Sequence, residues 1–316
     1  MKQRFQSRLM VAAGAVGAVA FLLAIGGCSK AAVAQKPAGP LIEYLGAWGV
    51  KGAEPGQLDQ PAGIATDVRG NVYIADAGSR YVEKFSQQGT PMLAFQDDHL
   101  KHPQSIAVDR GGAIYVSDPV RATVFVFFPD GTRYREIHVK AKGNAENTLD
   151  VTVADDGSMS VLDVNGAKVF DFTPSFRLVR TWQPKPAPST PSNASGRPKS
   201  IVAGQADALY VSGLGGDIQR YSDGKLTAEL GPVEDGTKVG IGDQFAVTNN
   251  YIFVTDPDGR ALHVWTSDGQ PKVKVDLTPE LGQGERFAPP IAVSPAGELL
   301  VIDAPQSRVL RYRINL

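Results

Sequence analysis

The sequence has little of the residues on which metal and redox chemistry depend. It contains one cysteine, so no disulfide bond can form within the chain. Its four histidines are His99, His102, His138 and His263. Only the first two lie close together, in a stretch that also holds two aspartates but shows no pattern that would fix them in place. Because a metal centre needs three or four rigidly held ligands, we expect no metal site.

The chain also lacks an excess of positive charge and a long apolar segment. Its net charge is −1, whereas nucleic-acid binding usually requires a basic face, so we predict no nucleic-acid partner. The apolar run from Met10 to Ile25 has about 16 residues, fewer than the roughly 20 that span a bilayer as a helix. The sequence has no Gly-x-Ser-x-Gly elbow and no phosphate loop, so these motifs give no sign of catalysis.

The N-terminus has the pattern of an export signal. A basic start leads into the apolar run and then into Gly26-Gly27-Cys28, which is the order of a cleaved signal peptide. The segment from Ala24 to Cys28 resembles a bacterial lipobox. This resemblance implies cleavage before Cys28 and a covalent lipid on its Sγ, the one cofactor-like group that we expect. Several acyl chains would anchor the protein almost permanently, at about 0.8 kcal/mol for each buried methylene.

We therefore predict a signal peptide over residues 1–27, a lipidated cysteine with a flexible tether over 28–40, and a folded domain over 41–316. Ser29 after the cysteine resembles the sorting signal for the outer membrane of Gram-negative bacteria. The expected location is thus the bacterial cell envelope, facing the periplasm or the cell surface. An uncleaved helical anchor and a secreted protein with a free thiol remain alternatives.

A repeated unit occupies the rest of the chain. Pro61-Ala-Gly-Ile-Ala is followed by Val72-Tyr-Ile-Ala-Asp76, and the same pattern returns 42 residues later from Pro103 to Asp118. Six such units can be aligned. Each has three short runs of strand-forming residues separated by turns, usually followed by a fourth, which predicts antiparallel strands. A period of this length predicts a β-propeller, so we expect an all-β, six-bladed propeller with four strands in each blade.

The two ends of the chain are complementary. The sixth unit stops after its third strand, whereas residues 43–48 look like a fourth strand without a blade. We predict that this N-terminal strand completes the last blade and closes the ring, because closure removes an open sheet edge. The pattern in residues 61–89, with its lead-in from Trp48 to Pro61, closely resembles the NHL repeat. Members of that family bind proteins or RNA, act as sensors or, in a few cases, are enzymes, so the resemblance implies a fold more than a function.

The repeat predicts which face of the ring is variable. The second-to-third loops and the links between blades are long and irregular, whereas the other turns are short, and function tends to lie in irregular loops. An aspartate recurs on this long-loop face. We assign these aspartates a structural role, accepting loop N–H groups; they are Asp76, Asp118, Asp163, Asp256 and Asp303. The candidate binding residues on the same face are Arg80, Arg121, Arg260, Arg308 and Asp258.

The sequence as a whole favours a membrane-anchored binding or scaffolding module of the envelope, with no catalysis expected. Its partner would be an envelope protein, a peptide or a glycan. The alternative is a metal-dependent hydrolase or lyase with a site at the central channel mouth.

Overall fold

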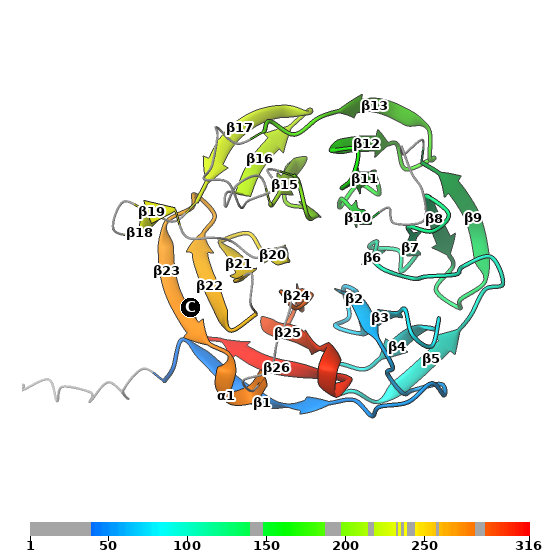
Figure 1. The fold of residues 1–316 in the computed structure, drawn as a ribbon, viewed down its shortest axis with the longest axis horizontal. Helices are drawn as coiled ribbons and strands as arrows, with labels where there is room; N and C mark the ends of the chain where they lie inside the picture. The colour runs from blue at the N-terminus through cyan, green and yellow to red at the C-terminus, as the bar shows by residue number, and fades with distance from the viewer. Residues whose placement is uncertain are drawn as a thin grey trace, which may run out of the picture. The chain divides into compact units, whose positions relative to one another are not determined.

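The computed structural model describes residues 39–139, 148–186, 197–213, 218–231, 233–234, 237–238, 244–256, 259–281 and 288–316. Six four-stranded antiparallel sheets stand around an open centre (Figure 1), which confirms the predicted six-bladed propeller. Each innermost strand contacts the innermost strand of the next blade, and β24 in turn contacts β2. The contacts therefore run once around the ring.

The strands occupy four positions from the centre outward. The innermost are β2 (Pro61–Thr66), β6 (Ile106–Val108), β10 (Leu149–Val153), β14 (Ile201–Ala203), β20 (Phe245–Val247) and β24 (Ile291–Val293). The second are β3 (Val72–Asp76), β7 (Ile114–Asp118), β11 (Met159–Asp163), β15 (Ala208–Val211), β21 (Tyr251–Thr255) and β25 (Glu298–Asp303). The third are β4 (Val82–Phe85), β8 (Thr123–Phe127), β12 (Lys168–Phe172), β16 (Ile218–Ser222), β22 (Ala261–Thr266) and β26 (Arg308–Ile314). The outermost are β5 (Pro91–Phe95), β9 (Arg133–His138), β13 (Leu178–Trp182), β17 (Lys225–Leu230), β23 (Pro271–Asp276) and β1 (Ile42–Trp48).

The remaining elements are short. A two-stranded hairpin of β18 (Val233–Glu234) and β19 (Thr237–Lys238) lies in the link between the fourth and fifth blades. The helix α1 (Thr278–Leu281) follows β23, and a 3₁₀ turn, η1 (Ala304–Gln306), joins β25 to β26. No helix in the described part of the chain is long and apolar enough to cross a membrane.

Burial explains the composition of the second strands. Every residue of β3, β7 and β11 is buried, because each sheet packs against a neighbouring sheet on both of its faces. The core therefore consists of apolar clusters between adjacent blades, such as Ile74 and Val72 of the first blade against Ile302 and Val309 of the last. Strands covered on both faces show continuous apolar runs, as the second strand of the repeat does.

The turns between the first and second strands are fixed by their own residues. In the first blade the Gly70 N–H donates to the Asp67 carbonyl at 2.9 Å, and in the second the Gly112 N–H donates to the Asp109 carbonyl at 3.0 Å. Both glycines have φ near +85° (82° and 86°), a conformation that glycine adopts without steric cost. These compact turns position the ends of the innermost strands around the channel.

The N-terminal strand pairs with the last blade. β1 lies antiparallel to β26, with Ile42 opposite Ile314 and Trp48 opposite Val309, as Figure 1 shows where blue and red strands run side by side. The Trp48 ring then packs on Phe85 of the first blade, with ring centroids 4.8 Å apart. The strand thus contacts both the last and the first blade. Its role in keeping the ring closed stays a prediction.

Candidate functional site at the channel mouth

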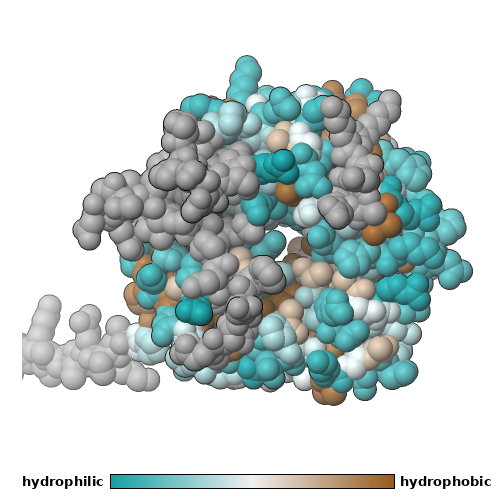
Figure 2. Space-filling view, viewed as in Figure 1, coloured by the Kyte–Doolittle hydropathy of each residue, from teal (hydrophilic) through white to brown (hydrophobic). Residues whose placement is uncertain are grey.

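Two cavities lie along the central channel, and the surface is hollowed at the centre of the ring (Figure 2). The larger cavity, of about 680 Å³, is lined by the turns between first and second strands of all six blades. We call it the short-turn mouth. The smaller one, of about 350 Å³, is lined by the innermost strands themselves and extends to the residues that precede them, such as Gln104 and Lys199. The larger cavity is therefore on the face opposite to the long loops.

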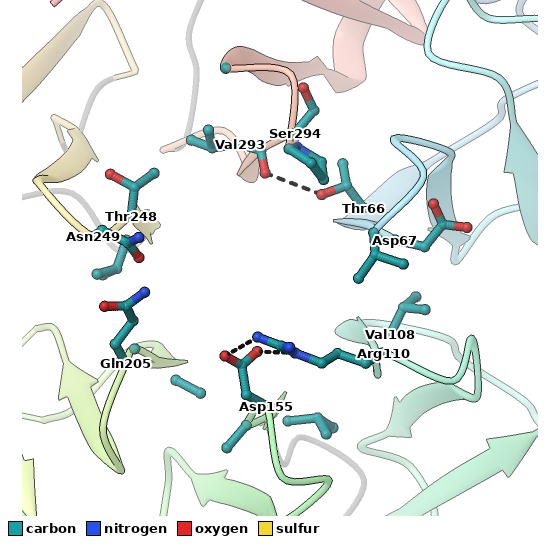
Figure 3. Close-up of a pocket in the computed structure, with 18 of the residues that line it drawn as sticks. Thr66, Asp67, Val108, Arg110, Asp155, Gln205, Thr248, Asn249, Val293 and Ser294 are labelled. Atoms are coloured by element: carbon teal, nitrogen blue, oxygen red, sulfur yellow. Dashed lines mark hydrogen bonds and ion pairs between the residues drawn. The ribbon is translucent and has the colours of Figure 1, made fainter.

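A ring of six small side chains, five of them aliphatic, forms the floor of the short-turn mouth. Each blade contributes the last residue of its innermost strand, and each of these residues is half-buried. We call this set the collar; it consists of Thr66, Val108, Val153, Ala203, Val247 and Val293. All members except Ala203 also line the smaller cavity, so the collar separates the two. The Thr66 hydroxyl donates to the Val293 carbonyl at 3.1 Å and joins the first blade to the last (Figure 3).

Charged residues at the rim above the collar are already partnered. The Arg110 guanidinium donates two hydrogen bonds to the Asp155 carboxylate, the Nε–Oδ1 bond being 2.9 Å (Figure 3). The Asp109 carboxylate is held in its own turn by the Ala113 N–H and the Tyr115 hydroxyl. The charges at the rim are thus used to shape the mouth.

Asp67 at the rim shows how strongly one turn is fixed. Its carboxylate accepts hydrogen bonds from the Arg69 and Asn71 N–H groups, the Asn71 amide and the Tyr73 hydroxyl, at 2.8–3.1 Å. Burial acts to raise the pKa of Asp67, but the hydrogen bonds, those from Asn71 foremost, lower it below the ordinary value. The Lys84 Nζ atom lies 3.8 Å from the Asp67 Oδ2 atom. Asp67 therefore stays ionised as an internal acceptor.

Three amides at the rim lack such partners. The side chains of Gln205, Asn249 and Asn250 are exposed and line the mouth. Within the described residues none of these side-chain amides has a hydrogen-bond partner. Figure 3 shows Gln205 and Asn249 on the same side of the opening, with Thr66 and Asp67 across it. Since an amide both donates and accepts, these groups can bind a ligand that does the same.

The smaller cavity contains a half-buried carboxylate that was not predicted from the sequence. Asp150 in β10 accepts hydrogen bonds from the Ser105 hydroxyl, the Ser200 hydroxyl and the Ile201 N–H, at 2.5, 2.6 and 2.8 Å. It thereby joins the second, third and fourth blades. Burial raises the pKa of Asp150, and the hydrogen bonds act against that rise. An alignment of the six units could have found it, because Asp150 replaces the small residues Gly63, Ser105 and Ser200 of other blades.

The repeated aspartates lie at or next to the ends of second strands, on the long-loop face. Asp76 accepts the N–H groups of Asp59, Gln60, Gly78 and Ser79. The other four also accept hydrogen bonds within their own part of the ring: Asp118 from Lys101 N, His102 N and Arg121 N, Asp163 from Gly166 N, Asp256 from Ala261 N, and Asp303 from Arg308 Nε. These bonds fix loops, and the structural role assigned from the sequence remains our interpretation.

The arginines predicted to bind a ligand lie on that same face and none of them lines either channel cavity. Arg80, Arg121 and Arg260 are exposed. Arg308 forms an ion pair with Asp303 at 2.8 Å and also donates to the Glu280 carbonyl. Asp258 and Cys28 lie outside the described residues. Binding by these residues therefore stays a prediction.

The loop that contains His99 and His102 makes contacts at the protein surface. His99 Nδ1 lies 2.6 Å from Glu136 Oε1, and Asp97 accepts a hydrogen bond from Arg133 at 2.8 Å. Across the part of the chain that the structure describes, no three His, Cys, Asp or Glu side chains are grouped so as to hold a metal ion.

Comparison with known proteins supports the fold and the repeat. No protein-family model matches the sequence. Among curated proteins, 147 residues are 26% identical to the human E3 ubiquitin-protein ligase TRIM32, a match that covers 41% of this chain and 22% of the ligase. The chain thus spans about a fifth of that relative, and the match supports the NHL-type repeat.

Solved structures with the same fold include structures of lyases. A streptogramin B lyase superposes with a TM-score of 0.61 at 15% identity, covering 86% of this chain and 98% of the lyase. Virginiamycin B lyase from Staphylococcus aureus superposes with a TM-score of 0.58 at 12% identity, covering 86% of this chain and 99% of the lyase. At such identities the likeness establishes a shared six-bladed architecture.

Proposed function

We propose that this protein is a binding module of the bacterial cell envelope, anchored by a lipid on Cys28, which takes up a partner at its short-turn mouth. One observation carries the proposal. The larger of the two channel cavities combines an apolar floor with three exposed amides that have no partner within the described residues. Concave sites that are largely apolar, with a few well-placed polar groups, are typical of ligand binding.

The architecture supports binding at this place. Every blade contributes to the floor, and the turns above it are fixed by hydrogen bonds such as those of Asp67. A partner would therefore meet a preformed surface, which lowers the ordering cost of association. An envelope protein, peptide or glycan could present the complementary groups, and the lipid anchor would keep the ring close to its membrane.

Replacing two of the three free amides should weaken partner capture. For the double variant Gln205→Ala, Asn249→Ala we expect at least about a tenfold loss in recovered envelope partner, since each lost hydrogen bond contributes on the order of 1 kcal/mol. The measurement is quantitative recovery of cross-linked envelope proteins by the full chain. The matched control is Arg80→Ala, Arg121→Ala, which changes two exposed side chains on the long-loop face. If only the control variant loses the partner, the binding site lies on the long-loop face and our assignment is wrong.

Replacing the lipidated cysteine should release the protein from membranes. In Cys28→Ala no thiol remains for acylation, so we expect the protein to move from the membrane fraction to the soluble fraction after cell fractionation. A substitution in the predicted tether, Ala32→Ser, serves as the control and should stay with the membrane. If the Cys28 variant stays membrane-bound, the anchor is of another kind.

The alternative drawn from the sequence, a metal-dependent hydrolase or lyase at the channel mouth, is separable from binding. Stoichiometric binding of a divalent cation to the purified full chain, with loss on Asp150→Asn or on replacing the rim carboxylates, would favour it. Partner capture that survives treatment with a chelator would favour the binding module.

A further inference from the structure

We propose that the short-turn mouth recognises an uncharged peptide segment and seats one aliphatic side chain of that segment in the collar. The inference rests on the proposed function, because it names the ligand class of the same site.

The collar exposes apolar surface within the cavity, which favours an aliphatic ligand group. Five of its six members, Val108, Val153, Ala203, Val247 and Val293, are aliphatic, and they remain half-exposed within a cavity while other aliphatic residues of the innermost strands, such as Ile201 and Ile291, are buried between blades. Apolar surface exposed in a concave site gains free energy when another apolar group covers it. The collar therefore fits a compact aliphatic side chain, such as that of leucine or valine, inserted along the channel axis.

The charges of the rim give the second argument. Four charged residues line the mouth: Asp67, Asp109, Arg110 and Asp155. Arg110 and Asp155 neutralise each other, and the carboxylates of Asp67 and Asp109 are turned into their own loops by internal hydrogen bonds. Each of these side chains is already held by hydrogen bonds within the described residues, so a charged ligand gains less here than it would at an unpaired charge. An uncharged segment does not depend on these charges.

The free amides give the third. Gln205 and Asn249 each offer a carbonyl and an NH₂ group at the rim, and Figure 3 places both on one side of the opening. A peptide bond carries one acceptor and one donor, so an amide side chain can accept from its N–H or donate to its carbonyl without any charge. A peptide backbone at the rim and an aliphatic side chain on the floor thus satisfy both layers of the cavity at once.

Size and polarity favour a peptide over a sugar. A cavity of about 680 Å³ falls in the roughly 300–1,000 Å³ range of sites that enclose small ligands, enough for a few residues of a loop. An uncharged oligosaccharide could use the amides, but it carries hydroxyl groups over its surface and has no aliphatic side chain for the collar. The apolar floor would then be covered by hydroxyls that lose their hydrogen bonds, which is unfavourable.

The test uses the full chain purified in detergent and four synthetic peptides, acetyl-Gly-Gly-Xaa-Gly-Gly-amide, in which Xaa is Leu, Gly, Lys or Glu. Maltotetraose is the uncharged sugar probe. Dissociation constants are measured by isothermal titration calorimetry. We expect the Leu peptide to bind at least about tenfold more tightly than the Gly peptide, the ratio expected from removing an aliphatic side chain from water. We also expect it to bind more tightly than the Lys and Glu peptides.

Substitutions in the collar test whether the preference for the Leu peptide arises there. Val247→Gln should abolish the preference for Leu over Gly. The control is Val120→Gln, the same substitution at an exposed valine on the long-loop face, and it should leave the preference unchanged. If Val247→Gln unfolds, the nearly isosteric pair Val108→Thr, Val247→Thr replaces it and should still reduce the preference at least threefold.

The outcomes separate the inference from the proposed function. Equal affinity for the Leu and Gly peptides, or tighter binding of a charged one, overturns the inference. Binding of maltotetraose that depends on Gln205 and Asn249 overturns the peptide class but leaves the mouth as a binding site. Absence of binding by any peptide overturns the inference, and partner capture that ignores the Gln205 and Asn249 substitutions overturns the proposed site itself.

Discussion

A chain that lacks residues 41–49 should unfold on the order of 10 °C below the full chain, because the loss of a whole strand removes several kcal/mol. β1 supplies the outermost strand of the last blade and pairs with β26 along its length. Without it the backbone N–H and C=O groups of β26 that face β1 would lose their partners, while those that pair with β25 would keep them. The last blade would then end in an open edge that can pair with other chains.

The side chains of β1 add to this effect. Tyr44 packs on Tyr312 with ring centroids 5.4 Å apart, and Trp48 packs on Phe85 of the first blade. Trp48 also closes on the turn after β4, where a Cβ atom added at Gly89 would lie 2.3 Å from the indole. One short strand therefore contributes to the cohesion of two blades that are at opposite ends of the sequence.

Differential scanning calorimetry on the two chains measures the change. The control is a deletion of equal length in the predicted tether, residues 30–38, which should leave the unfolding temperature unchanged. Trp48→Ala should lower the stability by about 2–3 kcal/mol, less than a fully buried tryptophan because the ring is only partly buried. Unfolding of the shortened chain at the same temperature as the full chain would show that β1 does not hold the ring closed.

Much of the fold could be predicted because the repeat itself encodes it. The unit from Pro61 to Asp76 carries a strand, a glycine turn and a doubly buried strand, and each is a local consequence of its residues. The same local patterns identified residues 43–48 as a strand without a blade of its own. Repetition made these patterns visible, since a feature that recurs at one position in several blades serves the blade.

The candidate site was harder to predict because it depends on how six distant segments meet. Long loops drew attention to one face, yet the channel cavity with the free amides lies on the other. Its floor is formed by ordinary valines that become distinctive only when six strand ends converge, as with Val108 and Val247. Its free amides occur where the fourth and fifth blades have drifted from the repeat, with Gly204 and Thr248 in place of the aspartate seen at Asp67. Departures from the repeat were therefore the signal, but on the short turns.

Glu83 is a second feature that was not predicted from the sequence. It precedes Lys84 in β4 and is only 1% exposed. The segment between β1 and β2 covers it, and the Gly56 N–H donates to its Oε1 at 2.9 Å. Within the described residues its Oε2 is buried without a hydrogen-bond partner. Burial raises the pKa of Glu83 to about 7, the Gly56 hydrogen bond acts against the rise, and the nearby Asp76 carboxylate adds to it.

This raised pKa predicts that the protein loses stability as pH rises through the weakly acidic range. The unfolded chain releases the Glu83 proton near the ordinary value of 4.5, whereas the folded chain keeps it up to about pH 7. Between these values the folded state binds more protons than the unfolded state, so the free energy of unfolding falls with increasing pH. The decrease in the free energy of unfolding that Glu83 causes is close to zero below pH 4.5. It grows to about 3 kcal/mol by pH 7 and changes little at higher pH.

Glu83→Gln should remove this loss, because glutamine keeps an acceptor for the Gly56 N–H and cannot ionise. We expect the variant to be more stable than the parent chain at pH 8 by about 1–3 kcal/mol, the lower figure allowing for an NH₂ group buried without a partner. At pH 4.5 we expect no gain. The free energy of unfolding from urea titrations at several pH values gives the comparison, and the exposed Glu54, changed to Gln, is the control in the same segment. If the difference between Glu83→Gln and the parent chain is the same at pH 4.5 and pH 8, then the pKa of Glu83 is not raised in the folded protein. The segment between β1 and β2 would in that case be held by a charged acceptor instead of a neutral one.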